Sequence, residues 1–130
     1  MRPLALILCA FLSALSPTLV LADDRAQLRI ELQASMQRFI DRNVIDNTFV
    51  AINLEDGVLE EFVPTKAHEW ILQGDGFFVL CSDMRDRSGN SVTVDYFMTK
   101  VGRSYRVLRT EISNREPIRS LMRAGKLRKL

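Results

Sequence analysis

Cysteine and histidine are scarce in this chain of 130 residues, which has two cysteines, Cys9 and Cys81, and one histidine, His68. We expect Cys9 to be removed with the N-terminus, and the one remaining thiol cannot form a disulfide within the chain. No HExxH, HxH or CxxC spacing, phosphate loop, dinucleotide fingerprint or G-x-S-x-G is present. We therefore expect a domain that is stabilised by packing alone, without a metal or another cofactor.

Acidic residues are absent from residues 1–22, in which Arg2 is the only charge. An apolar stretch follows Arg2, Pro17 interrupts helical structure, and residues 20–22 suit a signal peptidase. We predict a secretory signal peptide over residues 1–22, cleaved between Ala22 and Asp23. The product would be periplasmic in a Gram-negative cell and otherwise secreted. An uncleaved membrane anchor is the alternative, because the segment is nearly long enough to cross a bilayer.

The chain after residue 22 has no large net charge, with 17 basic and 16 acidic residues. Residues 23–114, enough for one small domain, are mildly acidic. Residues 115–130 form a basic tail that contains six basic residues and one acidic residue. The tail has no aromatic residue on which a base could stack, so we do not expect a nucleic-acid partner.

A helical pattern precedes a series of strand-like segments. Apolar residues from Leu28 to Ile40 recur at three- and four-residue spacings, which predicts an amphipathic helix that begins near Asp23 and Asp24. Short runs rich in β-branched and aromatic residues follow, separated by Gly- and Asp-containing turns. They predict strands over residues 48–54, 58–63, 67–73, 77–86, 90–98 and 104–112.

The two strands on either side of Arg87-Ser88-Gly89 form a hairpin whose register can be predicted. A three-residue loop places Asp86 opposite Asn90, so that Leu80 faces Tyr96 and Cys81 faces Asp95. One face of the hairpin is then almost wholly apolar, as a half-buried sheet requires. That face consists of Phe78, Leu80, Met84, Val92, Val94, Tyr96 and Met98. The other face carries Val79, Cys81, Asp83, Asp95 and Phe97.

The order of these elements predicts an α+β domain. A long N-terminal helix would pack on an antiparallel meander of about six strands, and a short basic helix with Pro117 in its first turn would follow. We expect residues 126–130 to fray. In architecture alone, this order resembles the cystatin-like or NTF2-like shape, a helix cradled by a curled sheet. That shape occurs with many functions and implies none of them.

Cys81 and His68 are the first candidates for chemistry. His68 with Cys81 or Asp83 would form a base and a nucleophile, or a metal site, if folding brought them together. However, Asp95 faces Cys81 across the predicted hairpin, and a neighbouring carboxylate raises the pKa of a thiol. We therefore expect Cys81 to be a packing residue and His68 to be a surface or edge residue.

Three acidic residues lie in or near the hairpin. Asp86 suits the first position of the turn. Asp83 and Asp95 share a face, where they could serve as a general acid and base or simply line a groove. Apolar neighbours predict a raised pKa for the carboxyl of Asp95.

The basic tail carries a stripe formed by Arg115, Arg119 and Arg123, with Lys126 beyond it. Such a stripe can lie against an anionic lipid surface or an acidic partner, or it can be solvated while the opposite side of the helix packs. We predict at most a weak contact with an anionic surface.

These features predict an exported, non-enzymatic domain that binds a small apolar ligand or a protein partner through its sheet. The binding face would be that of Val79, Cys81, Asp83, Asp95 and Phe97, covered by a ligand, the tail helix or a second copy in a homodimer. Two alternatives remain open. One is a small enzyme with a pocket between helix and sheet that uses Asp95 and His68, and the other is a protein held at a surface by its cationic tail.

Overall fold

The computed structural model describes the backbone of residues 18–130 and the side chains from residue 22 onward. The predicted signal peptide, with Cys9, lies outside the described residues as far as residue 17. The first helix begins at Thr18 rather than at Asp23, so the predicted cleavage site lies within it. The earlier start is compatible with the sequence, because Leu and Ala between Thr18 and Ala22 are good helix formers. Export therefore stays a prediction.

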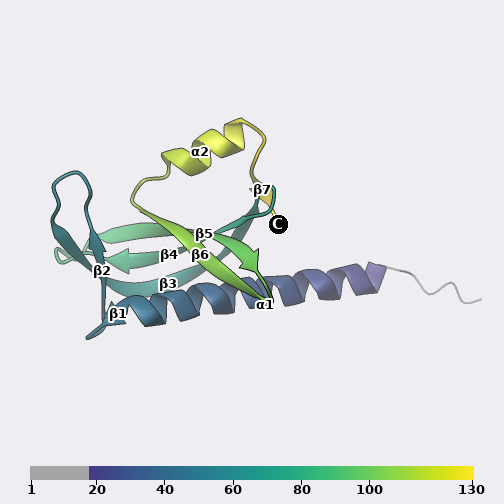
Figure 1. The fold of residues 1–130 in the computed structure, drawn as a ribbon, viewed down its shortest axis with the longest axis horizontal. Helices are drawn as coiled ribbons and strands as arrows, with labels where there is room; N and C mark the ends of the chain where they lie inside the picture. The colour runs from purple at the N-terminus through teal and green to yellow at the C-terminus, as the bar shows by residue number, and fades with distance from the viewer. Residues whose placement is uncertain (1–17) are drawn as a thin grey trace, which may run out of the picture.

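The described chain forms a long helix, a meander of antiparallel strands and a short helix (Figure 1). The elements are α1 (Thr18–Asn43), β1 (Val44–Ile45), β2 (Thr48–Ile52), β3 (Leu59–Gln73), β4 (Phe78–Arg85), β5 (Ser91–Val101), β6 (Ser104–Ile112), α2 (Glu116–Arg123) and β7 (Arg128–Lys129). Strands β1 to β6 pair in chain order, and β7 pairs with β3. The predicted α+β class is confirmed, with α1 along one face of the sheet and α2 over the other (Figure 1).

Strand β3 corrects the prediction of two separate strands over residues 58–63 and 67–73. Both segments belong to one strand of 15 residues, which continues through Pro64. The pairing of β3 with β4 has two irregularities, between Pro64 and Lys66 and between Ala67 and Ile71. They explain why the sequence pattern does not predict one continuous strand. Extra residues at a bulge interrupt the alternation that would identify a long strand in the sequence.

The predicted register of the β4–β5 hairpin is confirmed. Leu80 pairs with Tyr96 and Cys81 with Asp95, as the three-residue loop requires. The amide of Asp86 donates to the carbonyl of Asn90 at 3.0 Å, and this bond closes the turn. The two faces of the hairpin therefore carry the residues that the sequence assigned to them.

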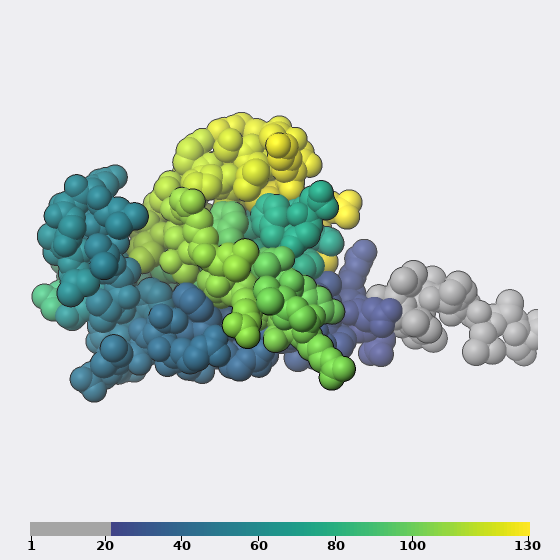
Figure 2. Space-filling model, in the orientation of Figure 1, coloured from purple at the N-terminus to yellow at the C-terminus, as the bar shows by residue number. Residues whose placement is uncertain are grey.

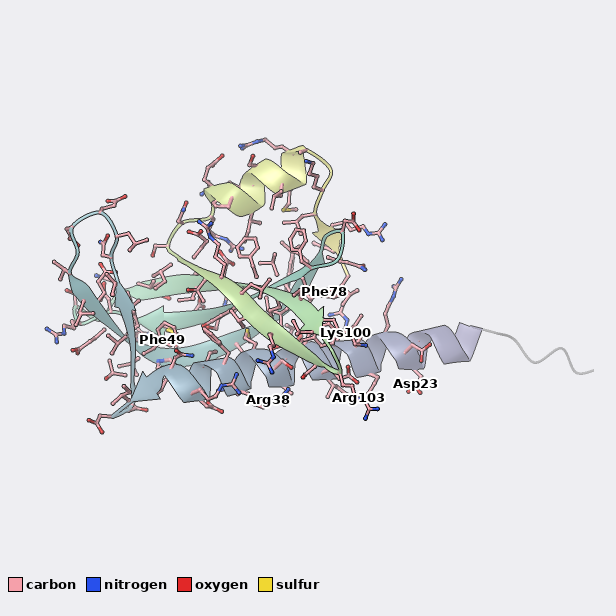
Figure 3. The ribbon with its side chains drawn as sticks, viewed as in Figure 1. Asp23, Arg38, Phe49, Phe78, Lys100 and Arg103 are labelled. Atoms are coloured by element: carbon pink, nitrogen blue, oxygen red, sulfur yellow. The ribbon has the colours of Figure 1, made fainter. Side chains whose placement is uncertain are left out.

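The larger core lies between α1 and the sheet. Leu32, Met36 and Ile40 of α1 are buried against the predicted apolar face of β4 and β5 and against Phe49 and Phe62 of β2 and β3. Phe49 and Phe78, labelled in Figure 3, lie over different parts of α1, and the turn of Lys100 and Arg103 passes beside that helix. Burial of this apolar surface is the main reason why α1 packs on the sheet.

A second, smaller core lies on the opposite face of the sheet. Ile118 of α2 and Leu127 are buried against Val79, with Phe77 and Phe97 beside them. In the space-filling view, α2 and the C-terminal residues cover this side of the molecule, opposite α1 (Figure 2). The tail helix thus supplies cover for the face around Phe97.

The C-terminal residues correct the expectation that residues 126–130 fray. Leu127 is only 5% exposed, and β7 pairs with Leu72 and Gln73 of β3. The amide of Leu130 also donates to the carbonyl of Ile71 at 3.0 Å. An apolar side chain buried near the terminus and these backbone bonds hold the segment in place. No helix among the described residues is long and apolar enough to cross a membrane.

Candidate functional site: a cavity between the sheet and α2

A cavity of about 620 Å³ lies on the α2 side of the sheet. Its apolar lining includes Trp70, Leu72, Val79, Ile118 and Met122. Its polar lining includes His68, Cys81, Asp95 and Arg115. The volume falls within the range of small-molecule sites, which combine an apolar wall with a few polar groups.

The structure brings together some of the residues predicted for the site. His68, Val79, Cys81 and Asp95 line the cavity. Asp83 touches it indirectly through its contact with His68, and Phe97 packs beneath α2 beside Phe77. The cavity lies between the sheet and the short helix α2, and both His68 and Asp95 line it.

His68 contacts Cys81 and Asp83 at the same time. Its Nδ1 lies 3.1 Å from Sγ of Cys81, and its Nε2 lies 2.8 Å from Oδ2 of Asp83. The other oxygen of Asp83 accepts a hydrogen bond of 3.0 Å from Oγ1 of Thr93. The sequence predicts a surface or edge residue at His68; its side chain is 29% exposed, and its ring bridges two side chains of β4.

The proton positions follow from the partners of the ring. The bonds from His68 and Thr93 favour the ionised form and lower the pKa of the Asp83 carboxyl, with the His68 bond contributing most. An ionised carboxylate only accepts hydrogen bonds, so Nε2–H of His68 donates to it. In the neutral ring, Nδ1 is then free to accept the proton of the Cys81 thiol.

The backbone of β3 explains how His68 reaches Cys81. Ala67 pairs with Ser82 and Ile71 with Leu80, so three residues of β3, including His68, lie opposite Cys81 alone. Bulges of this kind redirect side chains beside active sites. From the other layer, Nε2 of Gln33 in α1 donates to the carbonyl of His68 at 2.8 Å and holds this segment of backbone.

Cys81 is a buried free thiol with a high pKa. Burial is the largest cause and the nearby charge of Asp95 the next, while Arg115 opposes them, and the pKa rises to about 11. The sequence-based expectation of a raised pKa is confirmed. The thiol is therefore protonated at neutral pH.

Asp95 is the most unusual residue of the site. Its side chain is 1% exposed, and among the described residues neither of its carboxylate oxygens has a hydrogen-bond partner. Nη2 of Arg115 lies 3.2 Å from Oδ1, within ion-pair distance but without the alignment of a hydrogen bond. Burial raises the pKa of this carboxyl, as predicted, although the charges of Arg115 and His68 lower it. A buried polar group without a partner is costly and calls for an explanation.

Arg115 lines the cavity and Glu111 lies beside Asp95, although neither residue is predicted at this site from the sequence. Glu111 of β6 pairs with Asp95 across the ladder, and its own oxygens contact Arg109 and Asn114. Arg115 precedes α2 and reaches back to Asp95. The register carried on from the turn between Val101 and Ser104 would pair Asp95 with Thr110, so no signal in the sequence identifies Glu111 as its neighbour.

The rest of the basic tail is largely engaged by other side chains. Arg119 and Arg123 both form ion pairs with Glu116, at 3.8 and 2.6 Å. Lys126 is exposed. Nζ of Lys129 lies 3.9 Å from the centre of the Trp70 ring, at the edge of the cavity. These contacts reduce the free positive charge that the predicted stripe would present to a surface.

Within residues 18–130, no group of three or more histidine, cysteine or acidic side chains is arranged to hold a metal ion. The thiol of Cys81 and the carboxylate of Asp83 contact opposite nitrogens of the His68 ring. The arrangement is that of a nucleophile, a base and an orienting acid. No protein-family model, curated protein or solved structure matches this chain.

Proposed function

We propose that this protein is an exported domain that binds a small molecule in the cavity between the sheet and α2. The ligand would carry an apolar body and a hydrogen-bond-donating head, of which a protonated amine is the best fit. The observation that carries this proposal is Asp95, which is buried in the cavity wall and whose two oxygens have no hydrogen-bond donor within the described part of the chain.

The chemistry of the lining supports this class of ligand. Trp70, Val79 and Ile118 offer apolar and aromatic surface to the body of the ligand. A cationic head would place donors against Asp95 and would favour its ionised form, because an opposite charge nearby lowers a carboxyl pKa. Binding would thus offset the cost of burying this carboxylate.

The proposal specifies where on the fold the ligand lies. The other layer of the fold is the space between the long helix and the sheet. In this protein that space is filled by Leu32, Met36 and the other residues of the larger core. We propose the opposite face, roofed by α2, as the binding face.

Thermal denaturation with matched amine and alcohol probes tests the proposal. Phenethylamine should raise the midpoint of the wild-type protein, whereas phenethyl alcohol should not. A ligand at about one hundred times its Kd stabilises the folded state by about 2.7 kcal/mol. Asp95→Asn should abolish the shift, and Asp75→Asn, the same change at an exposed turn residue, should preserve it. Equal shifts for the amine in wild type and Asp95→Asn would contradict the proposal.

A further inference from the structure

The geometry of His68, Cys81 and Asp83 points to a second capacity of the same cavity, beyond binding. We propose that Cys81 is a nucleophile that accepts the acyl group of a small ester or thioester, with His68 as its general base and Asp83 as a positioning residue. The acyl group would carry an amine close to its carbonyl carbon. This inference rests on the proposed function, because the same contact with Asp95 binds the ligand in both.

The first support is the continuous line of contacts from thiol to carboxylate. Nδ1 of His68 is 3.1 Å from Sγ of Cys81, and Nε2 is 2.8 Å from Asp83, which Thr93 holds at its other oxygen. A nucleophile within reach of a base that is oriented by a third group is the diagnostic arrangement of covalent catalysis. A cavity of about 620 Å³ on the same wall provides space for an acyl donor.

The second support is independent of the thiol. Asp95 pairs directly with Cys81 across the ladder and lines the same cavity, and neither of its oxygens accepts a hydrogen bond from the described residues. Directly paired residues in an antiparallel sheet have Cα atoms about 4.5–5.5 Å apart. A molecule that places an amine on Asp95 therefore has room for its carbonyl carbon beside Sγ only if the amine is two or three bonds away from that carbon. An α- or β-amino acyl group satisfies this condition.

The resting state of the thiol fits a substrate-assisted step. Burial and the charge of Asp95 hold the thiol protonated, so Cys81 has little nucleophilic thiolate in the empty site. A bound ammonium group neutralises Asp95 and removes one of the two main causes of that high pKa. Activation of Cys81 is then coupled to the arrival of a ligand with the correct head group.

Each proton and bond in the step is accounted for. The thiol proton moves to Nδ1 of His68 as the Sγ–C bond forms, and the carbonyl oxygen takes the electron pair near the cation Arg115. The tetrahedral intermediate collapses, its bond to the leaving oxygen or sulfur breaks, and His68 returns the proton to that atom. Water then attacks the S-acyl carbon and gives a proton to His68. The Sγ–C bond breaks and His68 returns that proton to Sγ, which releases the carboxylic acid and restores the thiol.

The experiment compares leucine p-nitrophenyl ester with its N-acetyl derivative, and records nitrophenol release and the intact protein mass. The leucyl ester should acylate Cys81 of the wild type, and the acetylated ester, which lacks the charge, should do so far more slowly. Loss of a general base slows a reaction by about 10²–10⁴-fold, so His68→Gln should lower the acylation rate by at least about 100-fold. Cys81→Ala should abolish the mass gain.

Asp83→Asn provides a second variant that keeps the test informative if His68→Gln does not fold. Because Asp83 acts through His68, its replacement should lower the acylation rate and shift its pH profile, while Asp75→Asn should change neither. Wild-type rates in both His68→Gln and Asp83→Asn would show a thiol acting alone and overturn the inference.

The outcomes for the inference and for the proposed function can be separated. If phenethylamine stabilises the wild type and Cys81 of the folded protein is not acylated, the inference fails and the binding proposal stands. If neither occurs, both fail. The urea-unfolded protein should be acylated at a rate that is insensitive to His68→Gln, which confirms that the ester itself is reactive.

Discussion

Asp95 shows at the scale of one residue how a site can conflict with stability. Its neighbours across the ladder are Cys81 and Glu111, and the nearby cation Arg115 is not aligned for a hydrogen bond. A protein selected for stability alone would place an apolar residue here, because a buried carboxylate without donors is destabilising. Stability is commonly lost in this way where a residue serves binding or catalysis.

The raised pKa of Asp95 predicts a specific pH dependence of stability. Between the pKa of the unfolded chain and the higher pKa of the folded one, the folded state binds more protons, so the free energy of unfolding falls as the pH rises. This loss of stability is absent below the pKa that Asp95 has in the unfolded chain, and it is complete above the pKa that Asp95 has in the folded protein. Asp95→Asn has no such titration and should gain stability relative to wild type as the pH rises. Leaving a buried polar group unsatisfied costs on the order of 1–3 kcal/mol, which sets the expected size.

Urea denaturation of both proteins at a series of pH values from 3 to 8, an interval chosen to span the roughly 3.9 reference pKa of aspartate, measures this difference. The other carboxylates titrate in both proteins and cancel in the comparison. Parallel stability curves over the whole range would contradict the raised pKa. Asp75→Asn, at an exposed turn, serves as the control and should follow the wild-type curve.

At the scale of elements, strand irregularities decide which side chains meet. In β6, Val107 pairs with Met98 and Arg109 with Phe97, so Leu108 is an extra residue without a partner in β5. One extra residue exchanges the two faces of a strand. Before Leu108, Tyr105 and Val107 face the larger core. After Leu108, Thr110 and Ile112 lie on that same face. Glu111 reaches the α2 side, next to Asp95, only because of this bulge.

The packing of α2 predicts the effect of trimming its buried contact. Ile118 is 3% exposed and lies against Val79 in the smaller core. Ile118→Ala should lower the free energy of unfolding by about 2–5 kcal/mol, the usual cost of such a truncation in a core. Leu108→Ala removes an apolar side chain that is 68% exposed and should change stability by less than about 0.5 kcal/mol. Urea denaturation measures both, and equal effects would show that α2 does not pack as described.

At the scale of the whole molecule, one sheet supports both layers. β4 and β5 contribute Leu80, Tyr96 and Met98 to the core beneath α1, and Val79 and Phe97 to the core beneath α2. Gln33 and Arg29 of α1 also donate to backbone carbonyls of His68 and Glu69 in the strand that borders the cavity. The long helix thus positions a site that it does not itself line.

This sharing predicts one cooperative unfolding transition. Trp70 is the only tryptophan and lies at the cavity beneath Lys129, whereas much of the helical signal comes from α1 on the other face. Urea curves followed by Trp70 fluorescence and by far-UV circular dichroism should coincide, as two-state unfolding of a small domain requires. Separate midpoints would mean that the α2 layer with its cavity opens while the larger core remains folded.

The sequence by itself determined those features that depend on local rules. The loop of Arg87, Ser88 and Gly89 set the pairing of Cys81 with Asp95, and the apolar residues of α1 marked the face that packs. The high pKa values of that pair followed from their register and from their apolar neighbours. These features are local because a turn sets the pairing register of its two strands, and the spacing of apolar residues sets which face of a helix or strand is buried. Neither depends on the rest of the chain.

Only the tertiary structure decided that His68 meets Cys81 and Asp83, that Glu111 and Arg115 join Asp95, and that a cavity lies under α2. The bulges in β3 and β6 insert residues with no distinct sequence signal, and each insertion changes which side chains face the site. In the sequence, Arg115 belongs to a basic stripe. Its contact with Asp95 exists only because α2 packs back over the sheet. Pairing rules extend along a strand from a turn, but contacts between separate elements depend on how the packed layers lie in space.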